Sequence, residues 1–383
     1  MPWKETKPMD ERVRFIGAVS SRHYSMAELC RIYGISRKTG YKWVQRYAEE
    51  SVDGLKDRSR RPARSPRRSE ARCVEALLGE RRAHPLWGAR KLLVRLGRAH
   101  PDWPWPSAST AAAIFKRHGL VQPRRRRPRR DAPGKLYIEA PGANDLWTAD
   151  FKGQFRLGDR QKCYPLTVAD RCSRFLLGCR VVPGTTYAAT RSVFEELFAT
   201  YGLPSAMLTD NGPPFAGHFS PRRLSRLTVW WIRLGIEPLH IERGHPEQNG
   251  SHERMHRTLK AETARPPAAD LTRQQARFDC FRQEYNEERP HEGIGMKMPG
   301  ELYQSSPRPY PSRLPPLEYP GHFELRRSAA RGIRWQGRKL YISEVLEGEI
   351  LGLEEVDDGL WSIYFGPLLL GRYDQRTKDF DPR

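Results

Sequence analysis

Apolar residues recur at helical spacing through the first third of the chain and at strand-like spacing from about residue 144 onward. Between residues 25 and 47 the pattern predicts two short helices joined by a tight turn. Ser25 and Glu28 have the spacing of a capping box, Gly34 ends the first helix, and Ser36 caps the second over residues 37–47. This arrangement is typical of a helix-turn-helix DNA-binding unit.

The second of these helices carries cations near its start. We expect Arg37, Lys38 and Lys42 to project toward the major groove of DNA, while Val44 and Tyr47 pack inward. The alternative is an ordinary helical hairpin with a solvated basic face.

Three more helical stretches follow an Arg/Pro/Ser-rich segment, at residues 72–82, 88–97 and 109–119, and predict a second small helical unit. The next segment, QPRRRRPRRDAPG, holds six arginines and three prolines, so it cannot form a regular helix. We expect an extended linker along DNA phosphates, with contacts from Arg124, Arg125, Arg126 and Arg127. An inert charged spacer is the alternative.

From Asn144 onward, strand-like runs come first and helical runs are then interleaved with them, which favours an α/β domain with a central mixed sheet. Beyond residue 320, short alternating runs separated by QG and DDG turns predict a small β-barrel. The expected parts are a first helix-turn-helix domain at 1–62, a second helical DNA-binding domain at 63–122, a basic linker at 123–140, a catalytic core at 141–303, a linker at 304–321 and the barrel at 322–383.

The net charge of +22 is concentrated at one end of the chain. Residues 1–140 contain 33 basic and 14 acidic side chains, whereas the remaining residues contain 34 and 31. Such an asymmetry is typical of a polyanion-binding region joined to a nearly neutral body, and it indicates nucleic acid as the partner.

Other features narrow the class of protein. We find no run of 18 apolar residues and no signal-peptide core near the start of the chain, so a cytoplasmic protein is expected. The six cysteines form no C-x-x-C pair, which argues against a disulfide framework or a structural zinc site and predicts reduced thiols.

Two aspartates end apolar runs in the α/β region. Asp150 follows LWTA and Asp210 follows AMLT, so both are expected at strand ends beside a cleft. A third carboxylate, Glu253, leads a helical row with Arg257 and Lys260, while Met255 and Leu259 form the apolar stripe of the same helix. Three such carboxylates suit two Mg²⁺ ions, which can hold the attacking and leaving oxygens of a phosphoryl displacement.

Several alternatives to this site remain. Glu253 and Arg257 could simply form an ion pair on a solvated helix. Asp170 also ends a strand, and Glu247 could replace Glu253 if the helix register is wrong. The histidines His240, His245 and His252 could suggest zinc, but without a regular ligand spacing they are expected to be loop and helix-cap residues.

Three segments together resemble the signature motifs of the retroviral-integrase and DDE-transposase superfamily: WTAD with Asp150, TDNGPPF with Asp210, and HPEQNGSHERMHRTLK with Glu253. The stretches DRCSR and NEERPHEGIGMKMPGELY are similar to those of bacterial insertion-sequence transposases. The resemblance covers roughly residues 140–305 and implies a ribonuclease H-like core.

The resemblance implies roles for individual residues. Asp150 and Asp210 would hold one Mg²⁺, for which Mn²⁺ can substitute, and Asp150 with Glu253 would hold the second. Arg257 and Lys260, together with Asn249, would bind the DNA end. Two departures from the family pattern are present: 42 residues separate Asp210 from Glu253, more than is typical of integrases, and His256 stands where many relatives have Asn. The added residues are expected to form a loop and helix around residues 218–235.

The resemblance implies a transposase that binds the terminal inverted repeats of its element, hydrolyses the strand ends and joins them to target DNA, at least as a dimer on DNA. A DNA-binding regulator descended from such an enzyme and a plain metal-dependent nuclease are the alternatives. For the β-barrel, DNA binding and a role in packing or assembly are both open. The cations available for DNA binding there are Arg326, Arg327, Arg331, Arg334, Arg338 and Lys339.

Overall fold

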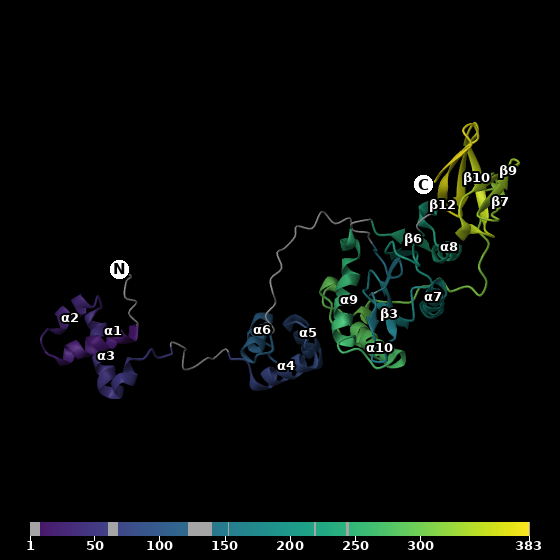
Figure 1. Ribbon diagram of the computed structural model, residues 1–383. Coiled ribbons are helices and arrows are strands. Elements are labelled where there is room, and N and C mark those ends of the chain that lie inside the picture. The colour runs from purple at the N-terminus through teal and green to yellow at the C-terminus, as the bar shows by residue number, and fades with distance from the viewer. Residues whose placement is uncertain are drawn as a thin grey trace. The chain divides into compact units, whose positions relative to one another are not determined.

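The computed structural model describes residues 8–59, 68–121, 140–151, 153–217, 220–242 and 245–382. The chain divides into two compact units, Met1–Arg68 and Ser69–Arg383 (Figure 1). The linker arginines Arg124, Arg125, Arg126 and Arg127 lie outside the described residues, so their contact with DNA stays a prediction.

The first unit is helical, as the sequence predicts. It contains α1 (Pro8–Ser20), α2 (Met26–Ile32), α3 (Arg37–Glu50) and the short η1 (Ser51–Leu55). The capping box at the start of α2 is confirmed, because the Ser25 side chain accepts from the Glu28 N–H and the Glu28 side chain accepts from the Ser25 N–H. Gly34 follows α2 with a φ of 64°, and the Ser36 side chain caps α3 by accepting from the Thr39 N–H.

The inward face of α3 differs from the prediction. Gly40 and Trp43 are its buried residues, Val44 is half-buried, and Tyr47 is 38% exposed rather than packed inward. Gly40 permits this close approach, since a Cβ at that position would lie 2.7 Å from the Cys30 sulfur. The helix therefore packs through an earlier turn than expected and leaves Tyr47 at the surface.

The three helices predicted after the Arg/Pro/Ser segment are confirmed as α4 (Ala71–Ala83), α5 (Ala89–Ala99) and α6 (Ala108–Arg117). They share a small apolar core built around Leu77, Trp87, Leu92 and Phe115. This three-helix part belongs to the second compact unit of the chain.

The expected mixed sheet is present in the middle of the second unit. Strands β1 (Leu146–Phe151), β3 (Lys162–Asp170) and β4 (Leu176–Val182) are antiparallel, and the short β2 (Phe155–Arg156) pairs with β3. On the other side of β1, strands β5 (Ala206–Thr209) and β6 (Glu237–His240) run parallel to it.

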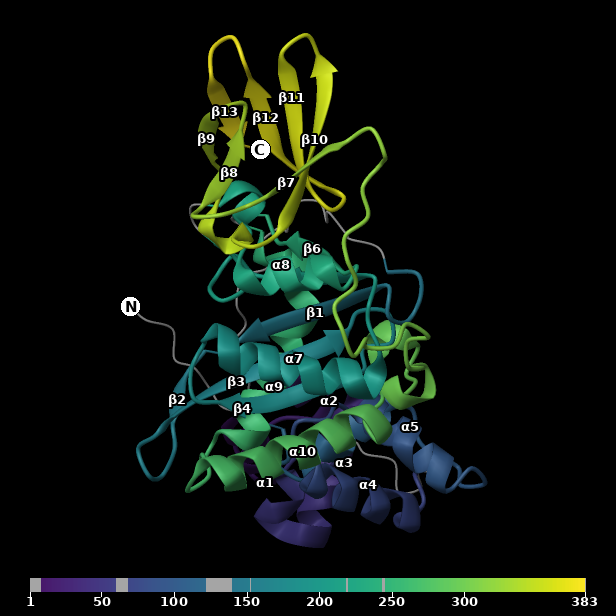
Figure 2. The ribbon, with the colours of Figure 1, turned by 90° about the vertical axis from the view of Figure 1, so that its right-hand side faces the viewer.

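Helices cover both faces of this sheet (Figure 2). Residues of α7 (Tyr187–Tyr201) and α8 (Arg226–Arg233) pack on one face around Trp147, Phe194 and Trp231. Residues of α9 (Gly250–Thr263) and α10 (Leu271–Glu287) pack on the other face.

The C-terminal part is an antiparallel sheet rather than the closed barrel predicted from its sequence. Its five strands are β7 (Glu324–Arg327), β10 (Ile350–Asp357), β11 (Leu360–Phe365), β12 (Leu368–Asp374) and β13 (Asp379–Pro382). Strands β8 (Gly332–Trp335) and β9 (Arg338–Tyr341) form a separate hairpin. The hairpin contributes Ile333 and Trp335 to the core by side-chain packing, so among the described strands β7 and β13 remain edges and no ladder closes the sheet.

Helix α8 contacts two apolar cores at once. Its residues Leu227, Trp230 and Trp231 belong to the core of the central sheet, whereas Val229 and Ile232 belong to the core of the C-terminal sheet. An ion pair of 2.8 Å between Arg233 and Glu349 adds a polar contact across the same junction. The central and C-terminal sheets are therefore joined through α8, which lies between Asp210 and Glu253 along the chain.

The six cysteines are free thiols, as expected. Among the described residues, no helix combines the length and apolar character needed to cross a bilayer.

Candidate active site

The two candidate aspartates lie at the same end of adjacent strands. Parallel pairing of β1 with β5 places Ala149 opposite Thr209, so Asp150 and Asp210 each come one residue after this pair. The residues before them are buried and apolar or hydrogen-bonded, whereas both aspartates are only partly buried. The sheet therefore presents both carboxylates at one edge, as the sequence predicts.

The loop after Asp210 is held by local hydrogen bonds. The Gly212 N–H donates to Asp210 Oδ1 at 3.1 Å, and the Asn211 amide donates to the Ile241 carbonyl at 2.8 Å. His240 lies below, with Nδ1 3.2 Å from Thr209 Oγ1. Burial lowers the pKa of His240. Asp210 therefore sits on a fixed turn.

Helix α9 carries the third carboxylate. It begins after Asn249 and exposes Glu253, Arg257 and Lys260, while Met255 and Leu259 are buried against α10 and the sheet. The polar and apolar stripes of this helix are thus those that the sequence predicts.

Two buried histidines hold α9 against the strands, so the prediction of a loop or helix-cap position for His252 is wrong. His252 and His256 are each 2% exposed. Both Nε2 atoms lie 2.6 Å from the Thr167 hydroxyl, and His252 Nδ1 lies 2.9 Å from the Thr148 hydroxyl. The signal available in the sequence is their i, i+4 spacing on the stripe beside Met255 and Leu259.

The same histidines bring α9 to Asp150. His256 Nδ1 lies 3.5 Å from Asp150 Oδ2, and the Thr167 hydroxyl donates to the Asp150 carbonyl at 3.1 Å. Glu253 precedes His256 by three residues, so the two side chains leave neighbouring parts of the α9 surface, with Glu253 exposed and His256 buried. Within the described ranges, however, no three His, Cys, Asp or Glu side chains converge into a set that could hold a metal ion.

The donor chemistry at this edge still suits Mg²⁺. Asp150, Asp210 and Glu253 offer only carboxylate oxygens, the ligands that this ion prefers. Because Glu253 is exposed, a change of its side-chain rotamer requires no unpacking of α9. These three residues suit a divalent metal by the type of their oxygens, and their role as its ligands stays a prediction.

The competing residues occupy other surroundings. Asp170 is 1% exposed and accepts hydrogen bonds from the Asn144 N–H, the Ser173 N–H and the Ser173 hydroxyl. Burial raises the pKa of this carboxyl, while the hydrogen bonds act in the opposite direction. Asp170 therefore organises a turn away from solvent. Glu247 lies in the short helix η3 (Pro246–Asn249), before α9.

Removal of His252 is expected to lower stability. In His252→Ala the hydroxyls of Thr148 and Thr167 lose a buried partner, and a cavity forms between α9 and the sheet. We expect a loss of about 3 kcal/mol in the free energy of unfolding, measured by urea denaturation. Lys260→Ala, at an exposed position of the same helix, is the control, and an equal loss in both variants would contradict this role for His252.

The predicted DNA contacts have different exposures. Arg37, Lys38 and Lys42 are exposed on the first turns of α3, in the first unit. In the second unit, Asn249 is only 5% exposed, so its side chain could reach DNA only after a rearrangement of the loop before α9. Contact of these residues with DNA stays a prediction.

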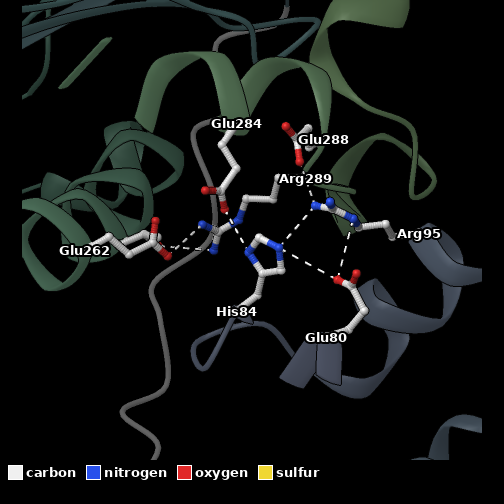
Figure 3. A network of polar contacts seen from close by, with 8 residues as sticks. Glu80, His84, Arg95, Glu262, Glu284, Glu288 and Arg289 are labelled. Carbon is white, nitrogen blue, oxygen red and sulfur yellow. Dashed lines mark hydrogen bonds and ion pairs between the residues drawn. The ribbon is translucent and has the colours of Figure 1, made fainter. Parts of the chain in front are cut away.

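Arg95 of α5 and His84, which follows α4, contact carboxylates of the central domain (Figure 3). Arg95 Nη1 donates to Glu288 Oε2 at 2.7 Å, and His84 Nδ1 lies 3.2 Å from Glu284 Oε1. Arg98 forms an ion pair with Glu301, in the short helix η5 (Pro299–Glu301). Arg95 and Arg98 of the helical unit predicted to bind DNA are thus paired with carboxylates within the protein.

Comparisons with known protein families match the N-terminal helical regions and the central α/β region of this chain. Residues 140–246 and 234–299 match two models of the integrase core domain. Residues 11–63 match a helix-turn-helix domain, and residues 39–115 match a homeodomain-like domain. The family resemblance inferred from the three signature segments is confirmed by the integrase core matches.

Relatives of similar sequence come from mobile elements and retroviruses. An uncharacterised 31.7 kDa protein of insertion element IS407 from Burkholderia multivorans is 27% identical over 49% of this chain and 66% of its own length. An uncharacterised 39.2 kDa protein of insertion element IS476 from Xanthomonas euvesicatoria is 28% identical over 61% and 63%. The Pol polyprotein of Radiation murine leukemia virus is 29% identical over 35% of this chain and 21% of its own length. The chain thus spans just under two thirds of the two insertion-element relatives.

Two solved structures show weaker likeness. The simian T-cell lymphotropic virus intasome in complex with PP2A regulatory subunit B56 gamma has a chain that is 17% identical, with 77% of this chain and 97% of that chain covered and a TM-score of 0.39. The HTLV-2 integrase catalytic core domain in complex with magnesium is 18% identical over 43% of this chain and 100% of that chain, with a TM-score of 0.33. Both TM-scores are below 0.5, so these two structures do not bear on the function of this chain.

Proposed function

We propose that this protein, whose central part matches integrase core domain models, binds the terminal inverted repeats of a mobile DNA element, cleaves the strand ends and joins them to target DNA. The observation that carries the proposal is the placement of Asp150 and Asp210 on adjacent parallel strands, with Glu253 on a helix fixed against the same strands.

In this proposal Asp150 and Asp210 hold one divalent metal, and Asp150 and Glu253 hold a second. Two Mg²⁺ ions bound there would neutralise the charge that develops on the reacting phosphate and orient the oxygens that exchange on it. Arg257 and Lys260 extend from the same exposed face of α9 as Glu253, so they would hold the phosphates on either side of the reacting bond. A water molecule and then a DNA 3′-hydroxyl would serve as nucleophile.

The helix-turn-helix unit would supply recognition of the repeats, through Arg37, Lys38 and Lys42. Bringing two ends of an element together requires at least two copies of the chain on DNA. The matches to helix-turn-helix and integrase core domains in one chain support this division of recognition and chemistry.

One observation favours a second function, a DNA-binding regulator without catalysis. Over the residues that the structure describes, the three carboxylates do not form a ready-made metal site, and His256 contacts Asp150 instead. A regulator would bind the same DNA ends and leave them intact.

The two functions are separated by one assay. The full chain is incubated with Mg²⁺, a labelled duplex carrying the inverted repeat that flanks its gene, and a supercoiled target plasmid. A transposase is expected to nick the labelled strand at the repeat end and to join it covalently to the plasmid, whereas a duplex with a shuffled repeat stays uncut. Specific binding of the repeat without nicking or joining would support the regulator and overturn the transposase.

A further inference from the structure

A cavity of about 310 Å³ lies beside the exposed face of α9. Its walls come from α5, α9, the turn between β3 and β4, and the segment from α10 to the short helix η4 (Glu292–Ile294). The charged residues that line it are Lys91, Arg174, Arg254, Arg289 and Glu292. Four cations thus surround this space against one carboxylate.

Most of this positive charge has no carboxylate partner. Arg289 pairs with Glu262 at 3.3 Å, but no carboxylate of the described residues lies within ion-pair distance of Lys91, Arg174 or Arg254. Burial and the neighbouring Arg289 lower the pKa of Lys91 to about 8. Several cations therefore lie close together around the cavity, and a bound anion would reduce the electrostatic repulsion between them.

Arg289 is held rigidly in the wall. Arg289 is 8% exposed, and its guanidinium donates to Glu262 Oε1 and to Thr258 Oγ1. The guanidinium carbon also lies 5.7 Å from the Trp87 ring centroid. The Arg289 Nε atom is buried and has no hydrogen-bond partner among the described residues. This cation is fixed before any ligand arrives.

Lys91 reaches the cavity from α5, the helix that carries Arg95 of the network in Figure 3. Lys91, Arg95 and Arg98 follow one another at i, i+4 and i+7, so they share one stripe of α5. The ion pairs of Arg95 with Glu288 and of Arg98 with Glu301 hold this stripe against α10 and η5. The first residue of the stripe is left without such a pair and lines the cavity.

The cavity is next to the candidate catalytic face. Arg254 follows Glu253 directly, so its side chain leaves α9 about 100° further around the helix axis. Arg254 lines the cavity, whereas Glu253, Arg257 and Lys260 lie on the neighbouring exposed stripe. A strand that crosses α9 at Glu253 would meet Arg254 and then the cavity.

We propose that this cavity binds a backbone phosphate of the DNA strand whose reacting phosphate lies at Glu253, with Arg174 and Arg254 as the closing cations and Arg289 and Lys91 as the wall. This inference rests on the proposed function. Arginine suits the role because its planar guanidinium can donate two parallel hydrogen bonds to phosphate oxygens. Occupation of the cavity would set the direction in which the strand leaves the active site.

The test uses the full chain in the absence of divalent metal, so that binding is measured without cleavage. The probe is the labelled repeat duplex, and its affinity is measured over a range of salt concentrations. For the double variant Arg174→Asn with Arg254→Gln, we expect the slope of log K against log salt to become shallower by about 0.9, the value for one lost phosphate contact. Asn is chosen at position 174 because that residue has a φ of 67°, a conformation that Asn tolerates.

Arg273→Gln is the matched control, since Arg273 is an exposed arginine of α10 outside the cavity lining. It is expected to keep the wild-type slope. Thermal unfolding of all three proteins without ligand shows whether the double variant is folded. A folded double variant with the same slope as the control would overturn the assignment to DNA.

A second experiment tests whether the cavity binds free phosphate rather than a phosphate of DNA. Inorganic phosphate and pyrophosphate are added at constant ionic strength, and the Tm is followed. If they raise the Tm of the wild type saturably but not that of the double variant, while the DNA slope is unchanged, the phosphate site is supported and its DNA source is overturned. No change in either arm would overturn the site itself. Cleavage in Mg²⁺ by Asp150→Asn would contradict the proposed catalytic site but would leave these binding results standing.

Discussion

Replacing Glu253 by glutamine is expected to abolish cleavage and joining while binding of the repeat duplex stays within a few-fold of wild type. Glutamine keeps the size of the side chain but removes the anionic oxygen needed by a divalent metal. A loss of several kcal/mol in transition-state stabilisation corresponds to a rate reduction of about a thousandfold or more. Because Glu253 is exposed on α9, the change should leave the packing of Met255 and Leu259 intact. Single-turnover cleavage in Mg²⁺ and equilibrium binding without metal measure the two properties separately.

The control for this change is Glu247→Gln, in η3. It removes one carboxylate close in sequence, and it is expected to cut at a rate near that of wild type. If Glu247→Gln were inactive and Glu253→Gln cut normally, the metal-binding register would be displaced and Glu253 would only pair with its neighbours on the helix.

Removal of divalent metal is expected to have an effect of the same size. Strand cleavage and joining should occur with Mg²⁺ or Mn²⁺ and should stop in excess chelator, because Asp150, Asp210 and Glu253 supply no positive charge of their own to the reacting phosphate. Ca²⁺ should not support the reaction, since it accepts looser and higher coordination than an in-line displacement allows. Product formation on denaturing gels, with each metal added back after chelation, measures this dependence.

The outcome that contradicts the metal site is full activity in excess chelator. Repeat binding serves as the internal control, because the helix-turn-helix unit needs no metal for its contacts. A loss of both binding and cleavage on chelation would indicate that the metal supports folding, which differs from the role proposed for the three carboxylates.

Local signals predicted the helical parts well where side chains cap the backbone. The Ser25–Glu28 capping box and the Ser36 cap define the starts of α2 and α3, because these contacts depend only on residues three apart. The prediction that Tyr47 packs inward was wrong because spacing alone allows several positions of α3 to face the core. Trp43 is buried instead, because α1 and α2 pack closely against α3 at Gly40. The sequence of α3 alone does not reveal how closely those helices approach.

In the candidate site, too, local patterns were predicted correctly and contacts between distant segments were not. Apolar runs that end in aspartate predicted that Asp150 and Asp210 meet at one sheet edge, and the pairing of β1 with β5 places them there. The role of His252 and His256 was missed because their partners, Thr148 and Thr167, lie about a hundred residues away. Their i, i+4 spacing beside Met255 and Leu259 indicates which face of α9 they share, but the hydroxyls that they contact are known only from the facing strands.

The C-terminal region was predicted as a barrel because short alternating strands and tight turns are compatible with both a closed and an open sheet. Closure depends on pairing between strands far apart in sequence, and here β7 pairs with β10 while β8 pairs with β9. Packing of Trp335 and Ile333 over the sheet covers the core without a closing ladder.

Because residues of α8 are buried in both the central core and the C-terminal core, the two parts are not expected to be stable as separate fragments. Val229 and Ile232 are covered by the C-terminal sheet, so a fragment that stops before that sheet would leave an apolar surface on the central core. Recombination or truncation at the proline-rich stretch near residue 310 would separate partners that bury each other. Helix α8 and the C-terminal sheet are therefore expected to be inherited together among related proteins, because each buries apolar residues of the other.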